Sequence, residues 1–342
     1  MEGGPDSSHG QGGALLLLFA VLLVGCSGRY RPEAFDPNSY VTASSTSLPL
    51  AESVEAATRA RAQGDFETAL RILSRLRLEG QSSAESAYQL AIALEEAQHY
   101  SQAVSVYQEL SRDPSSVRRN DAAFREALCL WQIDENKAAA RALRQVTPRG
   151  ALALSDRLKL DLATGVSWLR TGKSKRGQRK IIEALNAAND TQSVRFMQAL
   201  AVHALMEHTL AVAVELDLQV REKHQYRDLQ KRVALLRESE DHLRRLMGFS
   251  EIYWMLEGWL LLGDAYMRFS HDLSQAPAPK GLTKEQKAHY RSGLEAQALP
   301  LRQKGLLAYD RGVEVAIRAG RLDLKAAQTL QSRLLESMEA EE

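Results

Sequence analysis

The segment AYQLAIALEEAQHYSQAVSVYQELSRDP, residues 87–114, decides the fold because it predicts two short amphipathic helices joined by a polar turn. Each predicted helix carries a small residue, Ala91 in the first and Ala103 twelve positions later in the second. The same pair recurs at intervals of 34, 36 and 38 residues, as Ala57 with Ala69, Ala127 with Ala139, and Gly165 with Gly177. A period of this length is typical of a solenoid built from helical hairpins.

Large apolar residues recur beside the small ones, for example Leu73, Tyr107 and Leu143 at equivalent positions. A small residue lets two helix backbones approach, and a large residue of the neighbour fills the space beside it. The 44% of hydrophobic residues are mostly Ala and Leu with few β-branched runs, which favours helix over sheet. The 44 basic and 43 acidic residues leave a net charge of +1, so the overall charge predicts no nucleic-acid partner.

The two cysteines lie in different surroundings. Cys129 is part of the apolar helical stretch FREALCLW, which predicts a buried free thiol. Cys26 follows an unbroken apolar run, residues 14–24, which is too short to span a membrane and has the length of a signal-peptide core. Residues 1–25 contain no Lys or Arg, although such a leader usually begins with positive charge.

Residues 23–26, Leu-Val-Gly-Cys, resemble the lipobox of bacterial lipoproteins. The resemblance implies that residues 1–25 are a signal peptide, cleaved before Cys26, and that Cys26 then carries acyl chains. Ser27 in place of Asp is similar to outer-membrane lipoproteins, so we expect a periplasm-facing outer-membrane location, with surface exposure left open. We expect residues 26–50 to form a flexible tether, because residues 28–50 contain three prolines, six serines or threonines and no helical period.

Residues 259–266, WLLLGDAY, resemble the first helix of a tetratricopeptide repeat. The small and aromatic residues expected in its second helix come late, as Gly305, Tyr309 and Gly312. We therefore expect an insertion over about 268–299, with breakers at 277–281 and a short helix from Thr283. The resemblance covers residues 51–189 and about 251–320.

Residues 189–247 contain neither Gly nor Pro, which implies two long helices with a break near His208 or near Lys223. The sequence thus predicts an all-α fold, a tetratricopeptide-like hairpin solenoid with a central pair of long helices. We expect repeats over 51–189, long helices over 190–249, and over 250–342 a C-terminal hairpin with its insertion and a capping helix.

In tetratricopeptide repeats the first helix of each hairpin lines a concave groove. Carried over by position, the resemblance implies a groove rich in aromatic residues that suits an apolar peptide or helix. The predicted partner-binding residues are Arg61, Tyr88, Ile92, Glu95, Phe124, Leu128 and Trp131. The alternative, that the large side chains among them pack on neighbouring helices, stays open.

No convincing catalytic, cofactor or metal motif is present. Gly172-Lys173-Ser174 lacks the rest of a phosphate-binding loop, and His203 and His208 are five apart rather than four, so they do not share a helix face. The basic residues around Gly177 favour a solvated turn and helix face, and contact with anionic lipid or envelope polymer is left open; they are Lys173, Lys175, Arg176, Arg179 and Lys180.

The favoured hypothesis is a non-enzymatic, lipid-anchored scaffold that binds other envelope proteins and supports a multiprotein machine for secretion, pili, motility or barrel assembly. No small-molecule substrate is predicted. The alternative is a cell-wall enzyme or enzyme activator with its site in the insertion, on His271, Asp272, His289 and Tyr290. A weaker third hypothesis is a small-molecule cavity between the long helices.

Overall fold

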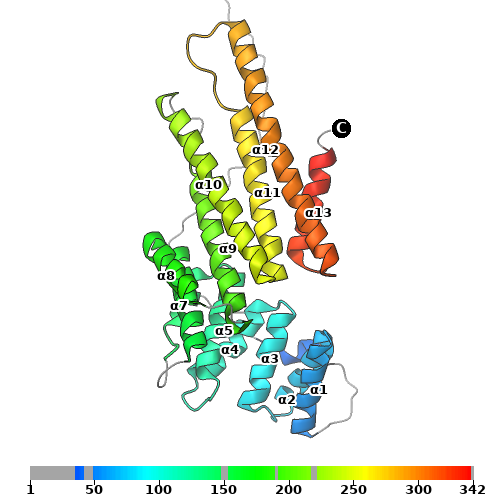
Figure 1. Cartoon of the computed structure of the whole chain (residues 1–342). Helices are drawn as coiled ribbons and strands as arrows, with labels where there is room; N and C mark the ends of the chain where they lie inside the picture. Colours follow the sequence, from blue (N-terminus) through cyan, green and yellow to red (C-terminus); the bar gives the residue numbers. More distant parts are fainter. Residues whose placement is uncertain (1–34, 42–48, 148–152, 189–191, 217–221, 340–342) are drawn as a thin grey trace, which may run out of the picture. The chain divides into compact units, whose positions relative to one another are not determined.

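The computed structural model describes residues 35–41, 49–147, 153–188, 192–216 and 222–339. The chain divides into a small unit, Met1–Arg31, and a compact unit, Pro32–Glu342, that holds every described element. Cys26, the predicted signal peptide and most of the tether lie outside the described residues. All described elements are helices, which confirms the predicted all-α fold (Figure 1).

The first half of the described chain is a series of helical hairpins, preceded by a short 3-10 helix, η1 (Pro37–Tyr40), which packs on the first of them. Consecutive helices contact each other along the whole series. The hairpins are α1 (Leu50–Ala62) with α2 (Phe66–Leu78), α3 (Ala84–Glu96) with α4 (Tyr100–Arg112), α5 (Arg119–Gln132) with α6 (Asn136–Leu143), and α7 (Leu154–Arg170) with α8 (Ser174–Ala187).

The small residues that set the sequence period lie at the contact of each pair of helices. The six alanines of the first three pairs are fully buried, and the two helices of each of these hairpins contact each other. The turns between the paired helices share one conformation, with a left-handed residue at Gly64, Gln98, Asp134 and Gly172. Gly172 therefore lies in the same kind of turn as the equivalent residues of the other three hairpins.

The fourth pair brings helix backbones into direct contact. A Cβ placed on Gly177 would lie 2.6 Å from the backbone nitrogen of Leu169 and 2.8 Å from the carbonyl oxygen of Gly165. A Cβ on Gly165 would lie 2.6 Å from Cγ1 of Ile181. Glycine is thus required at both positions for α7 and α8 to approach this closely.

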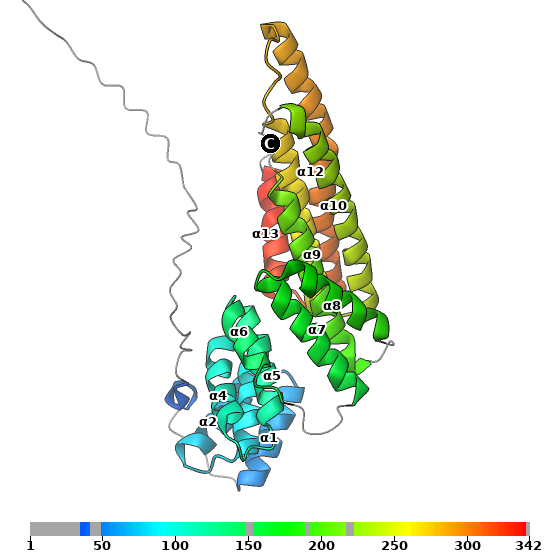
Figure 2. The same ribbon diagram turned by 90° about the vertical axis from the view of Figure 1, so that its left-hand side faces the viewer.

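The second half consists of longer helices. They are α9 (Gln192–Val214), α10 (Glu222–Phe249), α11 (Ile252–Ser274), α12 (Lys284–Arg318) and α13 (Lys325–Glu339). Helices α9 and α10 pack against each other as the predicted long pair, and α9 continues through His208, so a break at that residue is wrong. Helices α11 and α12 run side by side, and α13 packs on both (Figures 1 and 2).

The insertion takes a different form from the one expected. The prediction of a separate short helix from Thr283 is wrong. Thr283 caps α12, and this helix continues without a break through Pro300 to Arg318. The insertion lengthens both helices of one hairpin, and the breakers form the loop between them. The second helix of this repeat contains Gly305, Tyr309 and Gly312, as the sequence predicted. Tyr309 packs against Gly263 of the first helix and donates a hydrogen bond of 2.7 Å to Asp264.

Within the described residues one helix, Ser193–Val214, is long and apolar enough to cross a membrane, with a mean hydropathy of 1.3. Of its most apolar window 72% is buried inside the protein, as in the core helix of a globular domain. This composition is therefore weak evidence for a membrane span.

The buried face of α9 also holds a histidine without hydrogen-bond partners. The His203 ring lies 5.0 Å from the ring of Trp254 on α11, and neither ring nitrogen has a partner in the described structure. Complete burial, with a smaller contribution from Arg170, lowers the pKa of His203 to about 3. The folded protein therefore holds this side chain neutral at pH values where the unfolded chain protonates it.

The backbone contact at Gly177 predicts a large cost for one added methyl group. We expect Gly177→Ala to lower the free energy of unfolding by about 2 kcal/mol, because the new Cβ must separate two backbones. Urea unfolding followed by circular dichroism measures this change. The control is Gly293→Ala on α12, where no atom lies within 4 Å of the added Cβ and the gain in helix propensity should raise stability by about 0.5 to 1 kcal/mol. Equal effects of the two substitutions would contradict the proposed close contact.

His203 predicts a loss of stability in acid. Because its folded pKa lies below the ordinary value, its contribution is complete above pH 6.5 and is lost as the pH falls towards 3. Between pH 7 and pH 5 the wild-type protein should lose about 2 kcal/mol more than His203→Leu, which removes the titrating group and leaves no polar atom unpaired. Urea unfolding at both pH values tests this, and parallel losses in the two proteins would rule it out.

Candidate partner-binding cleft

A cleft of about 550 Å³ lies where α5, α7 and α9 come together. Helix α5 supplies one wall, the start of α7 and the start of α9 supply the others, and the end of α3 reaches its edge. The lining residues are Glu95, Asn120, Asp121, Phe124, Arg125, Leu128, Val146, Asp156, Lys159, Leu160, Ser193, Phe196 and Met197.

The cleft has apolar side chains from all three helices. Phe124 and Leu128 are one turn apart on α5, so they face the same way, and Phe196 on α9 joins them in the lining. Phe196 is 39% exposed, which is high for so large a hydrophobic side chain. The centre of its ring lies 5.9 Å from that of the Trp254 ring on α11, and this contact helps to fix the position of Phe196. The cleft therefore presents aromatic and aliphatic surface to the solvent.

Most charged residues of the lining already have a partner. Arg125 Nη1 lies 3.0 Å from Glu95 Oε2, and Lys159 Nζ lies 3.3 Å from Asp156 Oδ1. Asp121 accepts a hydrogen bond from the Tyr88 hydroxyl. A charged ligand would have to compete with these contacts, so the cleft favours an apolar one.

The wall at α5 belongs to a network that joins three helices. Arg125 Nε donates to the Tyr88 hydroxyl at 3.1 Å, and the Tyr107 hydroxyl donates to Glu95 at 2.7 Å. Burial, followed by the hydrogen bond to Asp121, raises the pKa of Tyr88 to about 12. Burial opposes the charge of Arg125, but Glu95 and the two tyrosines raise its pKa overall. The arginine thus stays charged and helps to hold α3, α4 and α5 together.

The structure places three of the seven predicted partner-binding residues in this cleft: Glu95, Phe124 and Leu128. Tyr88, Ile92 and Trp131 are only 5%, 9% and 4% exposed. These large side chains therefore pack inside the protein, which is the alternative that the sequence left open.

Arg61 is held between helices by two hydrogen bonds to Glu96, of 2.7 and 2.8 Å, and one to Gln89 of 2.6 Å. A partner-binding role of all seven residues stays a prediction.

Sequence reasoning missed the wall contributed by α9. The resemblance assigned groove positions only to the first helices of the four repeats, and α9 lies outside them. One signal was present in the sequence. Residues Met197, Leu200, Ala201, Ala204 and Leu205 form an apolar stripe at helical spacing, and Phe196 is a large apolar residue next to this stripe.

Two of the four residues proposed for the alternative enzyme site in the insertion, Asp272 and Tyr290, make structural contacts. Asp272 forms a 2.7 Å ion pair with Arg232, which is itself only 2% exposed. Tyr290 packs against the cluster around Leu273 and Leu294, and His271 and His289 are exposed. Across the described ranges no group of three or more His, Cys, Asp or Glu side chains is placed to hold a metal ion. Cys129 is free and buried as predicted, and burial raises the pKa of its thiol well above the usual value.

No protein-family model matches the chain, and no curated protein matches it. Among solved structures, it is similar to the MamA RS-1 ArsTM double mutant, with 20% identity, a TM-score of 0.36, and coverage of 56% of this chain and 96% of the other. It is also similar to the IFIT1 monomeric mutant with Gppp-AAAA, with 14% identity, a TM-score of 0.38, and coverage of 82% and 58%. At these values neither likeness carries an argument about function.

Proposed function

We propose that the protein is a scaffold that binds an apolar segment of another cell-envelope protein in the cleft between α5, α7 and α9. A lipid on Cys26 would hold it at the outer membrane, facing the periplasm. In this role it would support the assembly or function of a multiprotein envelope machine.

The observation that carries the proposal is the open apolar surface of the cleft. Phe124, Leu128 and Phe196 come from two helices that a rigid network and the α9–α11 contact hold in place. Binding of an amphipathic helix or an extended peptide needs such preformed apolar anchor sites. A small polar ligand would need unpaired polar groups to orient it, whereas the charged walls of this cleft are largely paired.

The proposed location rests on the sequence around Cys26. Its several acyl chains would anchor the protein firmly, since each buried methylene contributes about 0.8 kcal/mol. A tether of about 24 residues has a root-mean-square reach of roughly 25 to 30 Å if it is flexible. The folded unit could then meet partners at some distance from the membrane.

Site-specific photo-crosslinking in cells tests the cleft. With benzoylphenylalanine in place of Phe196, we expect a discrete crosslinked partner, which mass spectrometry identifies. Leu307 on α12 is the control position, because it is a 53% exposed hydrophobic residue outside the cleft. Adding Leu128→Ala to the Phe196 probe should reduce the adduct about tenfold, since loss of an apolar anchor costs more than 1 kcal/mol. The same adduct from both positions would refute the proposal.

Cys26→Ala tests the anchor. We expect the substitution to move most of the protein from the membrane fraction to the soluble fraction, because Cys26 is the proposed attachment point of the acyl chains. Fractionation without detergent, followed by immunoblotting, measures the distribution. The Cys129→Ala protein serves as the control and should stay with the membrane. Retention of the Cys26→Ala protein in the membrane would place the anchor elsewhere.

A further inference from the structure

A second cleft, of about 460 Å³, lies between α6, α7 and the start of α8. Its lining contains four basic residues and no acidic residue. The basic residues are Lys137, Arg141 and Arg144 from α6 and its C-terminal end, and Lys173 from the turn before α8. The remaining lining is Ala140, Leu143, Thr164, Ser167, Trp168 and Thr171.

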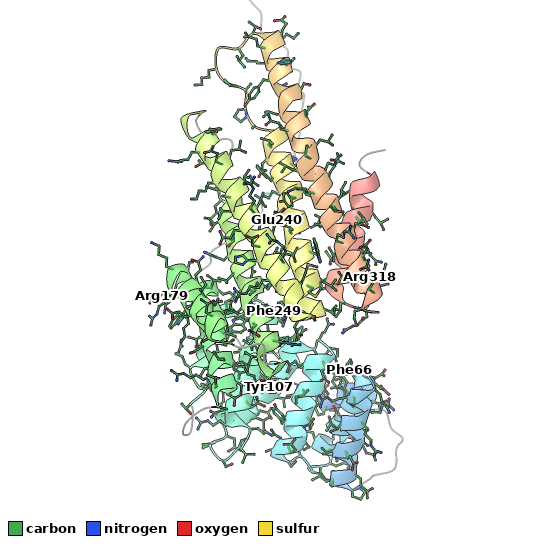
Figure 3. The ribbon with its side chains drawn as sticks, viewed as in Figure 1. Phe66, Tyr107, Arg179, Glu240, Phe249 and Arg318 are labelled. Atoms are coloured by element: carbon green, nitrogen blue, oxygen red, sulfur yellow. The ribbon has the colours of Figure 1, made fainter. Side chains whose placement is uncertain are left out.

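These cations differ from other basic residues nearby. On α8, Lys180 forms a 2.6 Å ion pair with Asp161, and Arg179, which Figure 3 labels, lies 3.7 Å from Glu183. Across the described part of the chain, none of the four basic lining residues forms an ion pair. The whole chain carries a net charge of only +1, so this positive cleft is a local feature.

The spacing of the cations gives the cleft two charged sides. Lys137, Arg141 and Arg144 follow one face of α6 at intervals of four and three residues and span roughly 10 Å along the helix. Lys173 stands opposite, at the N-terminus of α8. The first turn of α8 has no side-chain cap, so its backbone N–H groups add partial positive charge on that side.

Trp168, which lines the cleft, also contacts a basic residue outside the lining. The Arg176 guanidinium lies 4.0 Å from the centre of the Trp168 ring, in a cation–π contact that fixes both side chains. The guanidinium thus occupies one face of the only aromatic side chain in the lining, which makes this ring less available for base stacking.

We propose that this cleft binds phosphate groups, either two or more on one soluble molecule or those of anionic lipid headgroups. Arginine forks and the exposed amides at a helix N-terminus both suit phosphate oxygens. Thr164 and Ser167 add hydroxyl groups to the same lining, whereas the Thr171 hydroxyl already donates to the Ser167 carbonyl oxygen at 2.6 Å. Helix α7 contributes to both this cleft and the proposed partner-binding cleft, and the other helices of the two clefts differ. The four basic residues line only the present cleft.

Two binding measurements on the full-length protein distinguish the two sources of phosphate. Isothermal titration calorimetry with inorganic pyrophosphate reports binding of a soluble diphosphate. Flotation with vesicles of phosphatidylcholine, with and without 30% phosphatidylglycerol, reports binding of headgroups. An acyl chain on Cys26 would contribute equally to both kinds of vesicle, so the difference between them isolates the effect of charge.

The test variant is Lys137→Gln with Arg141→Gln and Lys173→Gln. Its matched control removes the same charges from the exposed start of α12, through Lys284→Gln, Lys287→Gln and Arg291→Gln. We expect the cleft variant to lose affinity by about tenfold or more in at least one measurement, because each basic residue near an anionic surface contributes to binding. The control should bind like the wild type.

Pyrophosphate binding alone would assign the site to a soluble phosphate compound, and preference for phosphatidylglycerol alone would assign it to lipid. The proposal is overturned if the cleft variant binds like the wild type, if both triple variants weaken equally, or if the wild type binds neither probe. Binding of an acidic peptide such as hexaglutamate in place of both probes would also overturn it, in favour of a protein ligand.

Discussion

The close approach of paired helices at small residues is the constraint on which the rest of this structure depends. Each hairpin of the first half closes on an alanine or glycine pair, and at Gly165 and Gly177 the backbones themselves are in contact. A larger residue at any of these positions would separate two helices that also pack on the next pair. Because consecutive helices contact each other along the series, one local separation would spread to the neighbouring hairpins.

The same packing device returns in the second half of the protein in a longer hairpin. Gly263 receives the ring of Tyr309, and Gly305 receives the side chain of Met267, so α11 and α12 approach as the shorter pairs do. The inserted residues extend both helices beyond this contact instead of forming a separate lobe. The fold thus tolerates a long insertion because the added residues continue two helices that the small residues already hold together.

Helix α7 takes part in both clefts, with different chemistry at its two ends. Its first turns contribute to the apolar cleft with α5 and α9, where charges are largely paired. Its last turns contribute to the basic cleft with α6 and α8, where the lining cations have no acidic partner among the described residues. One helix can serve two unlike surfaces because residues several turns apart meet different neighbours.

The sequence by itself determined the elements of this protein, because the spacing of small and large residues reports which helices form and which pairs meet. It predicted the all-α class, the four hairpins, the displaced second helix at Gly305 and Tyr309, and three residues of the cleft, Glu95, Phe124 and Leu128. Only the tertiary structure decided which aromatic side chains are exposed. Tyr88 occupies on α3 the position that Phe124 occupies on α5, and Trp131 lies two turns after Phe124 on α5, yet neighbouring helices cover both Tyr88 and Trp131. Phe196 joins the cleft from a helix outside the repeats. Helical periodicity describes one helix and its nearest partner, whereas exposure depends on contacts with helices far away in the chain.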